Sequence, residues 1–294
     1  MTRFTAASAA VAMMLLSHPG FAQQRAGPSQ GTAQLQQVAS FEHQVTGVTV
    51  STDGRIFVNF PRWTEEVTQV IRFDEKVAPQ GSYLNDVRFS PDGRHAYLTD
   101  AGAKGALVVV DLQTGRARRV LDGHPSTQPE KDVVVKTDGQ ELRRSDGRGV
   151  EFAADSVALS HDGRTLYWKA LTGRTLYRIT TDALENPRLS EKDLEARAEP
   201  VAETEPTDGL WIDRRGRLYL SAIEQDAVKV REGDRITTLV QDKRLRWPDT
   251  FSEGSDGTIY VTSSHIQDMS WFKPEAGPRL ETQLWRIEET RARQ

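Results

Sequence analysis

The side chains of this 294-residue chain best suited to chemistry are acids that stand at the beginning of short apolar segments. Asn85 and Asp86 precede one such segment, and Asp155, Asp208 and Asp249 precede three others. An oxygen-rich acidic set suits a hard cation such as Ca²⁺ or Mg²⁺, or a cationic organic ligand. An Asp before a strand also caps backbone amides in turns. Both a ligand role and a capping role therefore stay open for these acids.

The segments that follow these acids belong to a repeat. Each copy has an apolar run, a polar turn with a glycine, and a second run with an aromatic residue near its middle. The five copies are 47–60, 86–100, 156–170, 209–222 and 250–263. Four of the turns contain Asp-Gly, and glycine accepts the positive φ that a tight hairpin turn requires. We therefore expect five β-hairpins.

A third strand-like run follows most of these hairpins. The runs are 69–73, 107–112, 176–180, 227–230 and 284–287. Short strands that recur at about 40–50 residues are typical of a β-propeller, and a β-sandwich with coincidental Asp-Gly turns is the alternative. The predicted fold class is all-β, a β-propeller whose five repeats form five blades or an incomplete ring. A further hairpin around Asp138-Gly139 is predicted to be an insertion.

Propeller topology would gather the candidate residues at one channel mouth. The innermost strand of each blade lines the channel, and these strands begin at the same face. The predicted ligand-binding residues are Asn85, Asp86, Asp155, Asp208, Asp249, Arg62, Trp63 and His265. The predicted metal ligands among them are Asn85, Asp155 and Asp208. The alternative to ligand binding for His265 is a structural or surface role. Trp63 and Trp247 could line a pocket for a flat ligand, and the alternative for both is packing between blades.

The N-terminus is typical of an export signal. Arg3 precedes an apolar run from Phe4 to Leu16, and small residues lead to a cleavage position near Ala22. This run is shorter than the roughly 20 residues of a spanning helix. We predict a signal peptide over 1–22, a disordered leader over 23–33 and one propeller domain over 34–294. The chain is expected to be secreted or periplasmic, without a membrane anchor.

Composition excludes several function classes. The chain has no cysteine, which excludes disulfides, thiolate metal ligands and cysteine nucleophiles. With 38 basic and 42 acidic side chains it has no excess positive charge, so a nucleic-acid partner is not expected. The motifs GxSxG, GxGxxG, HExxH and the P-loop are absent from the sequence.

Several strings together resemble the bacterial branch of the major royal jelly / Yellow protein family. They are GRIFVNFPRW (54–63), GSYLNDVR (81–88), GALVVVDLQTGRARRVLDGHPSTQPE (105–130), LTGRTLYRI (171–179), TDGLWID (207–213) and LVQDKRLRWPDTF (239–251). The resemblance implies a secreted or periplasmic six-bladed propeller. Family members are associated with dopachrome conversion, binding of biogenic amines and nutritive roles. Bacterial relatives are labelled by analogy with gluconolactonases, which hold a divalent metal at the channel mouth.

The chain departs from this family pattern after Trp63. Relatives carry the inner strands of an additional blade between the NFPRW and YLNDVR strings. Here the segment 69–74 follows within a few residues and resembles the outer strand of that blade. The chain is therefore expected to lack most of one blade, with one set of ligand contacts removed.

Three functions are consistent with these features. The first is an exported propeller that binds a small aromatic or cationic molecule at the channel mouth. The second is a lactonase-like hydrolase, in which Ca²⁺, Mg²⁺ or Zn²⁺ polarises a carbonyl and Asp208 acts as base. The third is a non-enzymatic scaffold that binds a protein partner.

Overall fold

The structure is a computed structural model that describes residues 30–50, 54–59, 73–102, 104–276 and 280–289. Its sheets are antiparallel throughout, which confirms the predicted all-β class. The predicted signal peptide lies outside the described residues, and so do Arg62 and Trp63. Among the residues that are described, no helix has the length and apolar character needed to cross a membrane.

All five predicted hairpins are present. They are β3 (Gly47–Val50) with β4 (Ile56–Asn59), β5 (Leu84–Phe89) with β6 (His95–Asp100), β11 (Ala154–Leu159) with β12 (Thr165–Ala170), β15 (Thr207–Ile212) with β16 (Leu218–Ala222), and β19 (Pro248–Glu253) with β20 (Ile259–Ser263). The glycine of each connecting turn has a φ between +68° and +84°. These turns therefore use the left-handed conformation that glycine adopts without strain.

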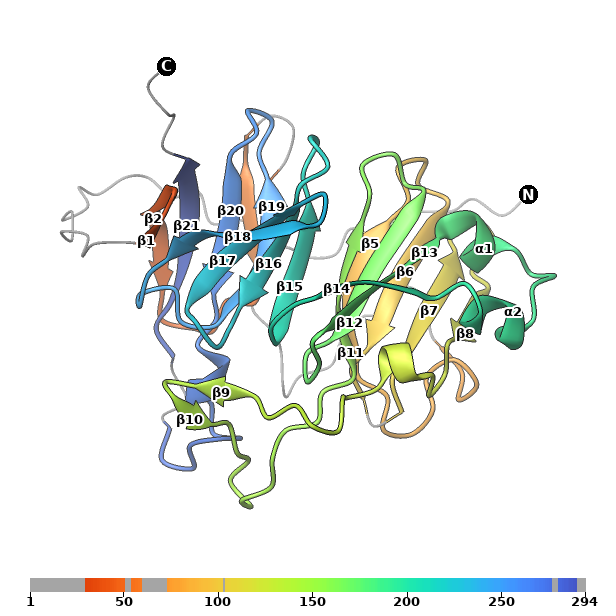
Figure 1. The fold of residues 1–294 in the computed structure, drawn as a ribbon, viewed down its shortest axis with the longest axis horizontal. Helices are drawn as coiled ribbons and strands as arrows, with labels where there is room; N and C mark the ends of the chain where they lie inside the picture. Colours follow the sequence, from red (N-terminus) through yellow and green to blue (C-terminus); the bar gives the residue numbers. More distant parts are fainter. Residues whose placement is uncertain (1–29, 51–53, 60–72, 103, 277–279, 290–294) are drawn as a thin grey trace, which may run out of the picture.

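Four of the hairpins are extended into blades of four strands or more (Figure 1). The added strands are β7 (Ala106–Asp111) and β8 (Ala117–Val120), β13 (Thr175–Thr180) and β14 (Glu199–Glu203), β17 (Ala227–Glu232) and β18 (Arg235–Gln241), and β21 (Thr282–Glu289) with β2 (Ala33–Phe41). The hairpin β3–β4 forms a sheet of two strands. The described residues thus form four complete blades, where the sequence predicted five repeats. The run 69–73 falls almost entirely outside the described residues.

The fourth blade joins the two ends of the chain. β2 pairs with β21 along its whole length, from Ala33 opposite Glu289 to Phe41 opposite Thr282. The short strand β1 (Gln30–Gly31) adds to the edge of β18 in the neighbouring blade. Strand structure therefore begins within the stretch 23–33, which was predicted to be a disordered leader. The apolar alternation of β2, with Ala33, Leu35 and Ala39 buried, explains why it docks.

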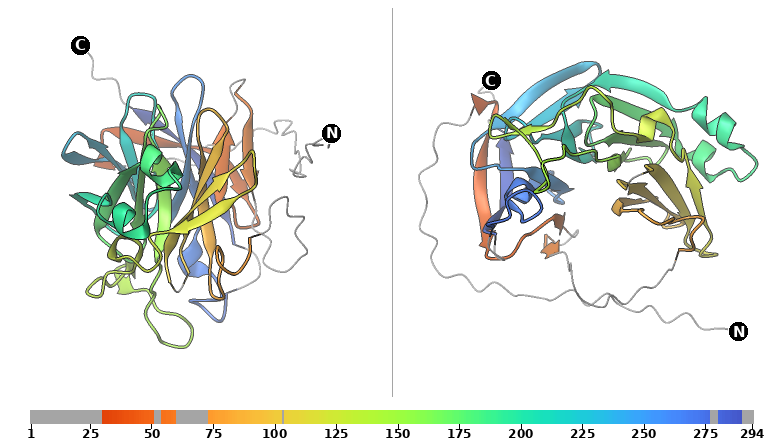
Figure 2. Two further views of the ribbon diagram at one scale, coloured as in Figure 1. Left: turned by 90° about the vertical axis from the view of Figure 1, so that its right-hand side faces the viewer. Right: turned by 90° about the horizontal axis from the view of Figure 1, so that it is seen from below.

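The sheets stand around an arc when the molecule is viewed along the channel (Figure 2, right). The inner strands contact one another in the order β5, β11, β15, β19 and β3. Within the described residues, β5 and β3 at the ends of this series make no comparable contact. The exposure of β5 reflects its end position: its residues alternate between half-buried and exposed, whereas β11 is almost fully buried.

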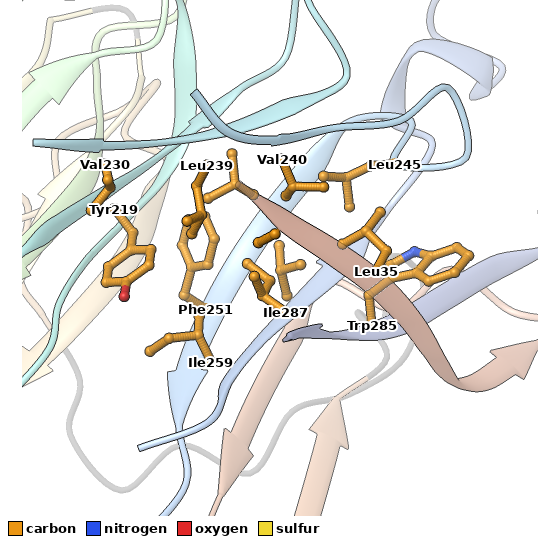
Figure 3. Packing of buried hydrophobic residues seen from close by; sticks show 13 residues of the cluster. Leu35, Tyr219, Val230, Leu239, Val240, Leu245, Phe251, Ile259, Trp285 and Ile287 are labelled. Carbon is orange, nitrogen blue, oxygen red and sulfur yellow. The ribbon is translucent and has the colours of Figure 1, made fainter. Parts of the chain in front are cut away.

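The core lies between neighbouring blades. One large cluster fills the space between the β15–β18 blade and the β19–β21–β2 blade, where Tyr219 and Phe251 lie beside one another and Trp285 packs at the other end among aliphatic neighbours (Figure 3). The rings of Tyr219 and Phe251 are 6.2 Å apart. Burying one such aromatic side chain contributes about 3 kcal/mol. This packing fixes the angle between blades and hence the position of each inner strand.

Two connections are longer than a turn. Helices α1 (Thr181–Glu185) and α2 (Glu191–Glu195) lie between β13 and β14. The predicted insertion is present as β9 (Lys136–Thr137) and β10 (Gln140–Glu141), with positive φ at both Asp138 and Gly139. In Figure 1 this hairpin lies below the sheets, on the side where the inner strands begin.

Candidate functional site

A β-bulge marks the start of each long inner strand. The register shifts between Leu84 and Val87 in β5, Ala154 and Ser156 in β11, Thr207 and Leu210 in β15, and Pro248 and Phe251 in β19. The residues inside these bulges are Asn85 with Asp86, Asp155, Asp208 with Gly209, and Asp249 with Thr250. A bulge bends the strand and changes the direction of a side chain. The bulges therefore turn the predicted acids toward the channel.

Hydroxyl groups on the second strand stabilise three of the bulges. Thr99 accepts a hydrogen bond from the backbone N–H of Asp86 at 3.1 Å, Ser221 accepts one from Gly209 at 2.7 Å, and Thr262 accepts one from Thr250 at 3.1 Å. Lys169 occupies the equivalent position in β12 and is fully buried. Its ammonium donates to the Thr204 hydroxyl at 2.7 Å, away from the channel.

Gly209 allows two inner strands to approach closely. A Cβ at this position would lie 1.6 Å from the carbonyl oxygen of Asp249, a separation that no side chain can adopt. Glycine is therefore required for β15 and β19 to lie at this distance. This approach brings the carboxyl groups of Asp208 and Asp249 into one cluster.

The three central acids, Asp155, Asp208 and Asp249, are each less than a tenth exposed. The Asn85 side-chain amide donates to Oδ1 of Asp155, and the indole N–H of Trp247 donates to Oδ2 of Asp208. Asp155 and Asp208 also interact directly with one another. We name these three residues the acidic cluster.

Burial and mutual repulsion favour the neutral form of the acidic cluster. Burial is the largest cause that raises the pKa of Asp155, followed by the charges of Asp208, Asp86 and Asp249. Burial raises the pKa of Asp208 to about 7, although the Trp247 hydrogen bond opposes this shift. The pKa of Asp249 is likewise raised, by burial first and by Asp208 second. A cation placed here would reverse these shifts, because it favours the ionised carboxylates.

A cavity of about 900 Å³ extends from the acidic cluster along the channel. Its aromatic lining residues are Tyr83, Phe89, Phe152, Trp211, Trp247, Phe251, Trp271 and Phe272. Burial and the three acids of the cluster raise the pKa of the Tyr83 hydroxyl to about 12, so it remains protonated. The volume falls within the range of about 300–1,000 Å³ for pockets that hold small organic molecules.

A cap closes the cavity on the side where the inner strands begin. Val135 and Leu142 of the insertion pack with Trp247, and Ile266 and Phe272 of the loop after β20 lie against them. The backbone N–H of Ser145 donates to the carbonyl oxygen of Trp271 at 2.8 Å, which joins the insertion to that loop. The insertion therefore packs against Trp247 and Trp271, which line the cavity, and supports this wall from outside.

Arg246 holds the two halves of this cap together. Its guanidinium donates to Asp138 on the insertion hairpin at 2.5 and 2.9 Å, and to Asp268 at 2.9 Å. Asp268 lies in the short helix η2 (Ile266–Asp268) of the loop after β20. The next residue, Trp247, points inward to Asp208. Consecutive residues thus connect the cap to the acidic cluster.

The structure brings together most of the predicted site residues. Asn85, Asp86, Asp155, Asp208 and Asp249 all line the cavity. His265 does not: it lies 3.1 Å from Oε1 of Gln283 and 3.7 Å from Asp268, and burial lowers its pKa. The binding role predicted for these residues, and for Arg62 and Trp63 outside the described part, stays a prediction.

Sequence reasoning missed Arg88, Tyr83 and Trp211 as lining residues. Arg88 could have been found, because it follows Asp86 by two positions and residues two apart share a face of a strand. Trp211 follows Asp208 by three positions, and only the bulge in β15 restores it to the channel. A bulge is not visible in the periodicity of the sequence.

The chemistry of the donor set only partly fits a divalent metal. Carboxylate and amide oxygens are suitable ligands for Ca²⁺ or Mg²⁺. However, the described residues contain no group of three or more His, Cys, Asp or Glu side chains arranged to hold a metal ion. The predicted set of Asn85, Asp155 and Asp208 supplies two carboxylates, and Asn85 turns its amide N–H toward one of them. This metal set stays a prediction.

Comparison with solved structures finds similarity at low identity. A putative gluconolactonase is 16% identical with a TM-score of 0.49, over 87% of this chain and 92% of that one. A gluconolactonase from Xanthomonas campestris is 14% identical with a TM-score of 0.44, over 82% and 64%. A hydrazine synthase chain from Kuenenia stuttgartiensis is 13% identical with a TM-score of 0.43, over 65% and 44%. The chain spans less than two thirds of the length of the last two.

Comparison with curated proteins finds no match. The model of the major royal jelly protein family matches residues 57–275, which is well over half of the chain. The match includes the inner strands that carry the acidic cluster and the insertion that caps it. It agrees with the resemblance of the strings quoted above, and the chain belongs to the major royal jelly protein family.

Proposed function

We propose that this chain is an exported binding propeller whose channel takes a small cationic aromatic molecule. The observation that carries the proposal is the convergence of Asp155, Asp208 and Asp249 in one cavity. No lysine, arginine or histidine among the described residues forms an ion pair with any of the three. Removing carboxylates from water without a counter-ion is unfavourable, and a bound cation would compensate for it.

The aromatic wall supports an organic cation over a metal ion. Tyr83, Trp211 and Trp247 line the cavity beside or beyond the acidic cluster, where their rings could pack on a flat ligand and face its charge. The cavity volume of about 900 Å³ suits a small organic molecule rather than a single ion. An ammonium group at the acidic cluster with an aromatic body along this wall would use both features.

Calorimetry with matched pairs of compounds tests this proposal. At pH 8 we expect dopamine and tryptamine to bind, and the uncharged analogues catechol and indole to bind at least 10-fold more weakly. Asp208→Asn should weaken amine binding at least 10-fold, because one carboxylate is lost. Asp234→Asn is the matched control, since the Asp234 side chain is fully exposed. If neither dopamine nor tryptamine binds, the proposal is contradicted.

The same protein preparation distinguishes the lactonase-like alternative. Two results together would favour that alternative. Elemental analysis would find stoichiometric Ca²⁺, Mg²⁺ or Zn²⁺, and EDTA would abolish amine binding or lactone hydrolysis. Binding that EDTA leaves unchanged favours the organic cation. Export is tested by fractionating expressing bacteria and sequencing the mature N-terminus, which we expect to begin near Gln23.

A further inference from the structure

Among the described residues, two buried N–H donors without a partner belong to side chains that line the same cavity. Nε of Arg88 and Nε1 of Trp211 are buried and make no hydrogen bond. The two side chains are in contact, with the guanidinium carbon of Arg88 5.7 Å from the centre of the Trp211 ring. Buried polar groups are almost always hydrogen-bonded. Two unpaired donors on side chains in contact therefore indicate a position for an acceptor that the described residues do not provide.

Arg88 also carries a charge that is only partly neutralised. Its other nitrogen atoms donate to the carbonyl oxygens of Val87 and Leu210, each at 2.8 Å. The nearest carboxylate, Asp86, is 3.8 Å away, beyond a direct hydrogen bond. An anionic acceptor at this place would pair with the guanidinium and use both free N–H groups.

The position of this pair along the channel is also defined. Arg88 and Trp211 line the cavity of about 900 Å³ and, with Phe89, a second hollow of about 240 Å³ toward the turns that end the inner strands. Arg88 binds the carbonyl of Leu210, two residues beyond Asp208 on β15. At no more than about 3.3 Å per residue across the bulge in β15, the guanidinium lies at most about 7 Å along the channel from Asp208.

We propose that Arg88 and Trp211 form an anion-accepting subsite, and that the channel selects an amphoteric aromatic ligand with a cationic nitrogen and a carboxylate at most about 7 Å apart. The nitrogen would lie at the acidic cluster and the carboxylate at Arg88 and Trp211, with the aromatic body between them. This selection rests on the proposed function, because it assumes that the acidic cluster binds the nitrogen. The anion subsite itself rests only on Arg88 and Trp211.

Three compounds that share one ring test the subsite by calorimetry: benzylamine, benzoate and 4-(aminomethyl)benzoate. We expect 4-(aminomethyl)benzoate to bind wild-type protein at least 10-fold more tightly than benzylamine does. Arg88→Gln should reduce this ratio to about one and leave benzylamine binding equal or stronger, because a repelling charge is gone. Arg164→Gln, which removes a charge from an exposed turn, is the matched control and should keep the wild-type ratio.

Trp211→Phe provides a second variant that keeps the ring and removes one donor, so it carries the test if Arg88→Gln does not fold. It should lower the ratio several-fold. The subsite is overturned if wild-type protein binds 4-(aminomethyl)benzoate no more tightly than benzylamine. It is also overturned if Arg88→Gln weakens the binding of both compounds by the same factor. Benzoate binding that depends on Arg88 supports the subsite even if benzylamine fails to bind, in which case only the proposed function falls. No heat from any compound overturns both.

Discussion

The indole N–H of Trp247 donates a hydrogen bond to Oδ2 of Asp208 from a backbone in the left-handed conformation, with φ at +49°. This conformation costs a residue other than glycine about 1–2 kcal/mol. The cost is offset where surrounding contacts fix the residue, and here Arg246 is ion-paired to the cap on one side while Trp247 is buried on the other. The hydrogen bond thus couples the cap to the charge of the acidic cluster.

Removing this hydrogen bond should weaken cation binding in a pH-dependent way. In Trp247→Phe the pKa of Asp208 rises further, because the N–H that favours its ionised form is lost. We expect amine affinity to fall about 5- to 10-fold at pH 7, and the deficit to narrow at pH 9, where Asp208 is ionised in both proteins. The unfolding free energy should fall by about 1–3 kcal/mol.

Trp168→Phe is the matched control for this change. Trp168 is fully buried and donates its indole N–H to the carbonyl of Ser126 at 3.0 Å, but it does not line the cavity. Its replacement should lower stability by a similar amount and leave amine affinity unchanged. A Trp247→Phe deficit of equal size at both pH values would refute the coupling.

The acidic cluster should make the free protein less stable as pH rises. The pKa of Asp208 is about 7 in the folded protein against an ordinary value of 3.8, so the folded state binds more protons between these values. For Asp208 the unfolding free energy therefore falls as pH increases from about 4 to about 7, by up to about 4 kcal/mol, and the raised pKa values of Asp155 and Asp249 add to this fall. Thermal melts across this range check the slope.

Asp208→Asn should flatten this pH dependence. The amide oxygen can still accept from Trp247, and the variant carries no charge to bury. We expect it to melt at a higher temperature than the wild type at pH 8 and at a similar temperature at pH 5. A wild-type protein whose stability rises from pH 5 to pH 7 as steeply as that of the variant would argue against a neutral cluster.

Loss of Arg246 should loosen the cap without unfolding the blades. The ion pairs of Arg246 with Asp138 and Asp268 are partly exposed, so Arg246→Gln should change the melting temperature little. Protease cleavage within 138–148 and 264–273 should become several-fold faster, and a bound amine should dissociate faster. Arg148→Gln in the same insertion is the control, since within the described part of the chain Arg148 pairs only with neighbouring Asp146 on the surface. Equal cleavage of both variants would show that Arg246 does not hold the cap.

Gly209 should tolerate no side chain. Gly209→Ala forces β15 and β19 apart, since the new Cβ would meet the Asp249 carbonyl oxygen. We expect a loss of stability above about 3 kcal/mol and loss of amine binding. Gly216→Ala is a useful comparison, because its surroundings are open and only its φ of +79° is unfavourable. It should cost about 1–2 kcal/mol. Similar denaturation midpoints for the two variants would contradict the close approach.

Much of this architecture could be predicted from local signals. The five hairpins follow from apolar runs on either side of a glycine turn, and the outer strands from the runs behind them. The acids were placed at one channel mouth because equivalent positions of a repeat occupy equivalent positions of a ring. Asn85, Asp155, Asp208 and Asp249 do line one cavity.

The remaining features depend on contacts between distant residues. The docking of β2 on β21 joins positions about 250 residues apart, such as Leu35 and Ile287, and no local pattern indicates such a pairing. The hydrogen bond between Asn85 and Asp155 crosses from one blade to the next. Trp211 enters the channel only through a bulge. His265 was predicted from its place after β20, but the loop that follows turns it toward Gln283.

The pairing of β2 with β21 also sets the order in which the protein can fold. β2 is among the first described segments of the chain, and its partner is the last. During synthesis β2 has no strand to join until residue 289 has been made, so the fourth blade forms last and the arc is completed by association of the two chain ends. Until then, the edge of β2 can pair with other chains, and its apolar residues Leu35 and Ala39, which are buried in the folded protein, stay exposed. Aggregation during refolding should therefore depend on this strand more than on any of the blades formed within one continuous segment.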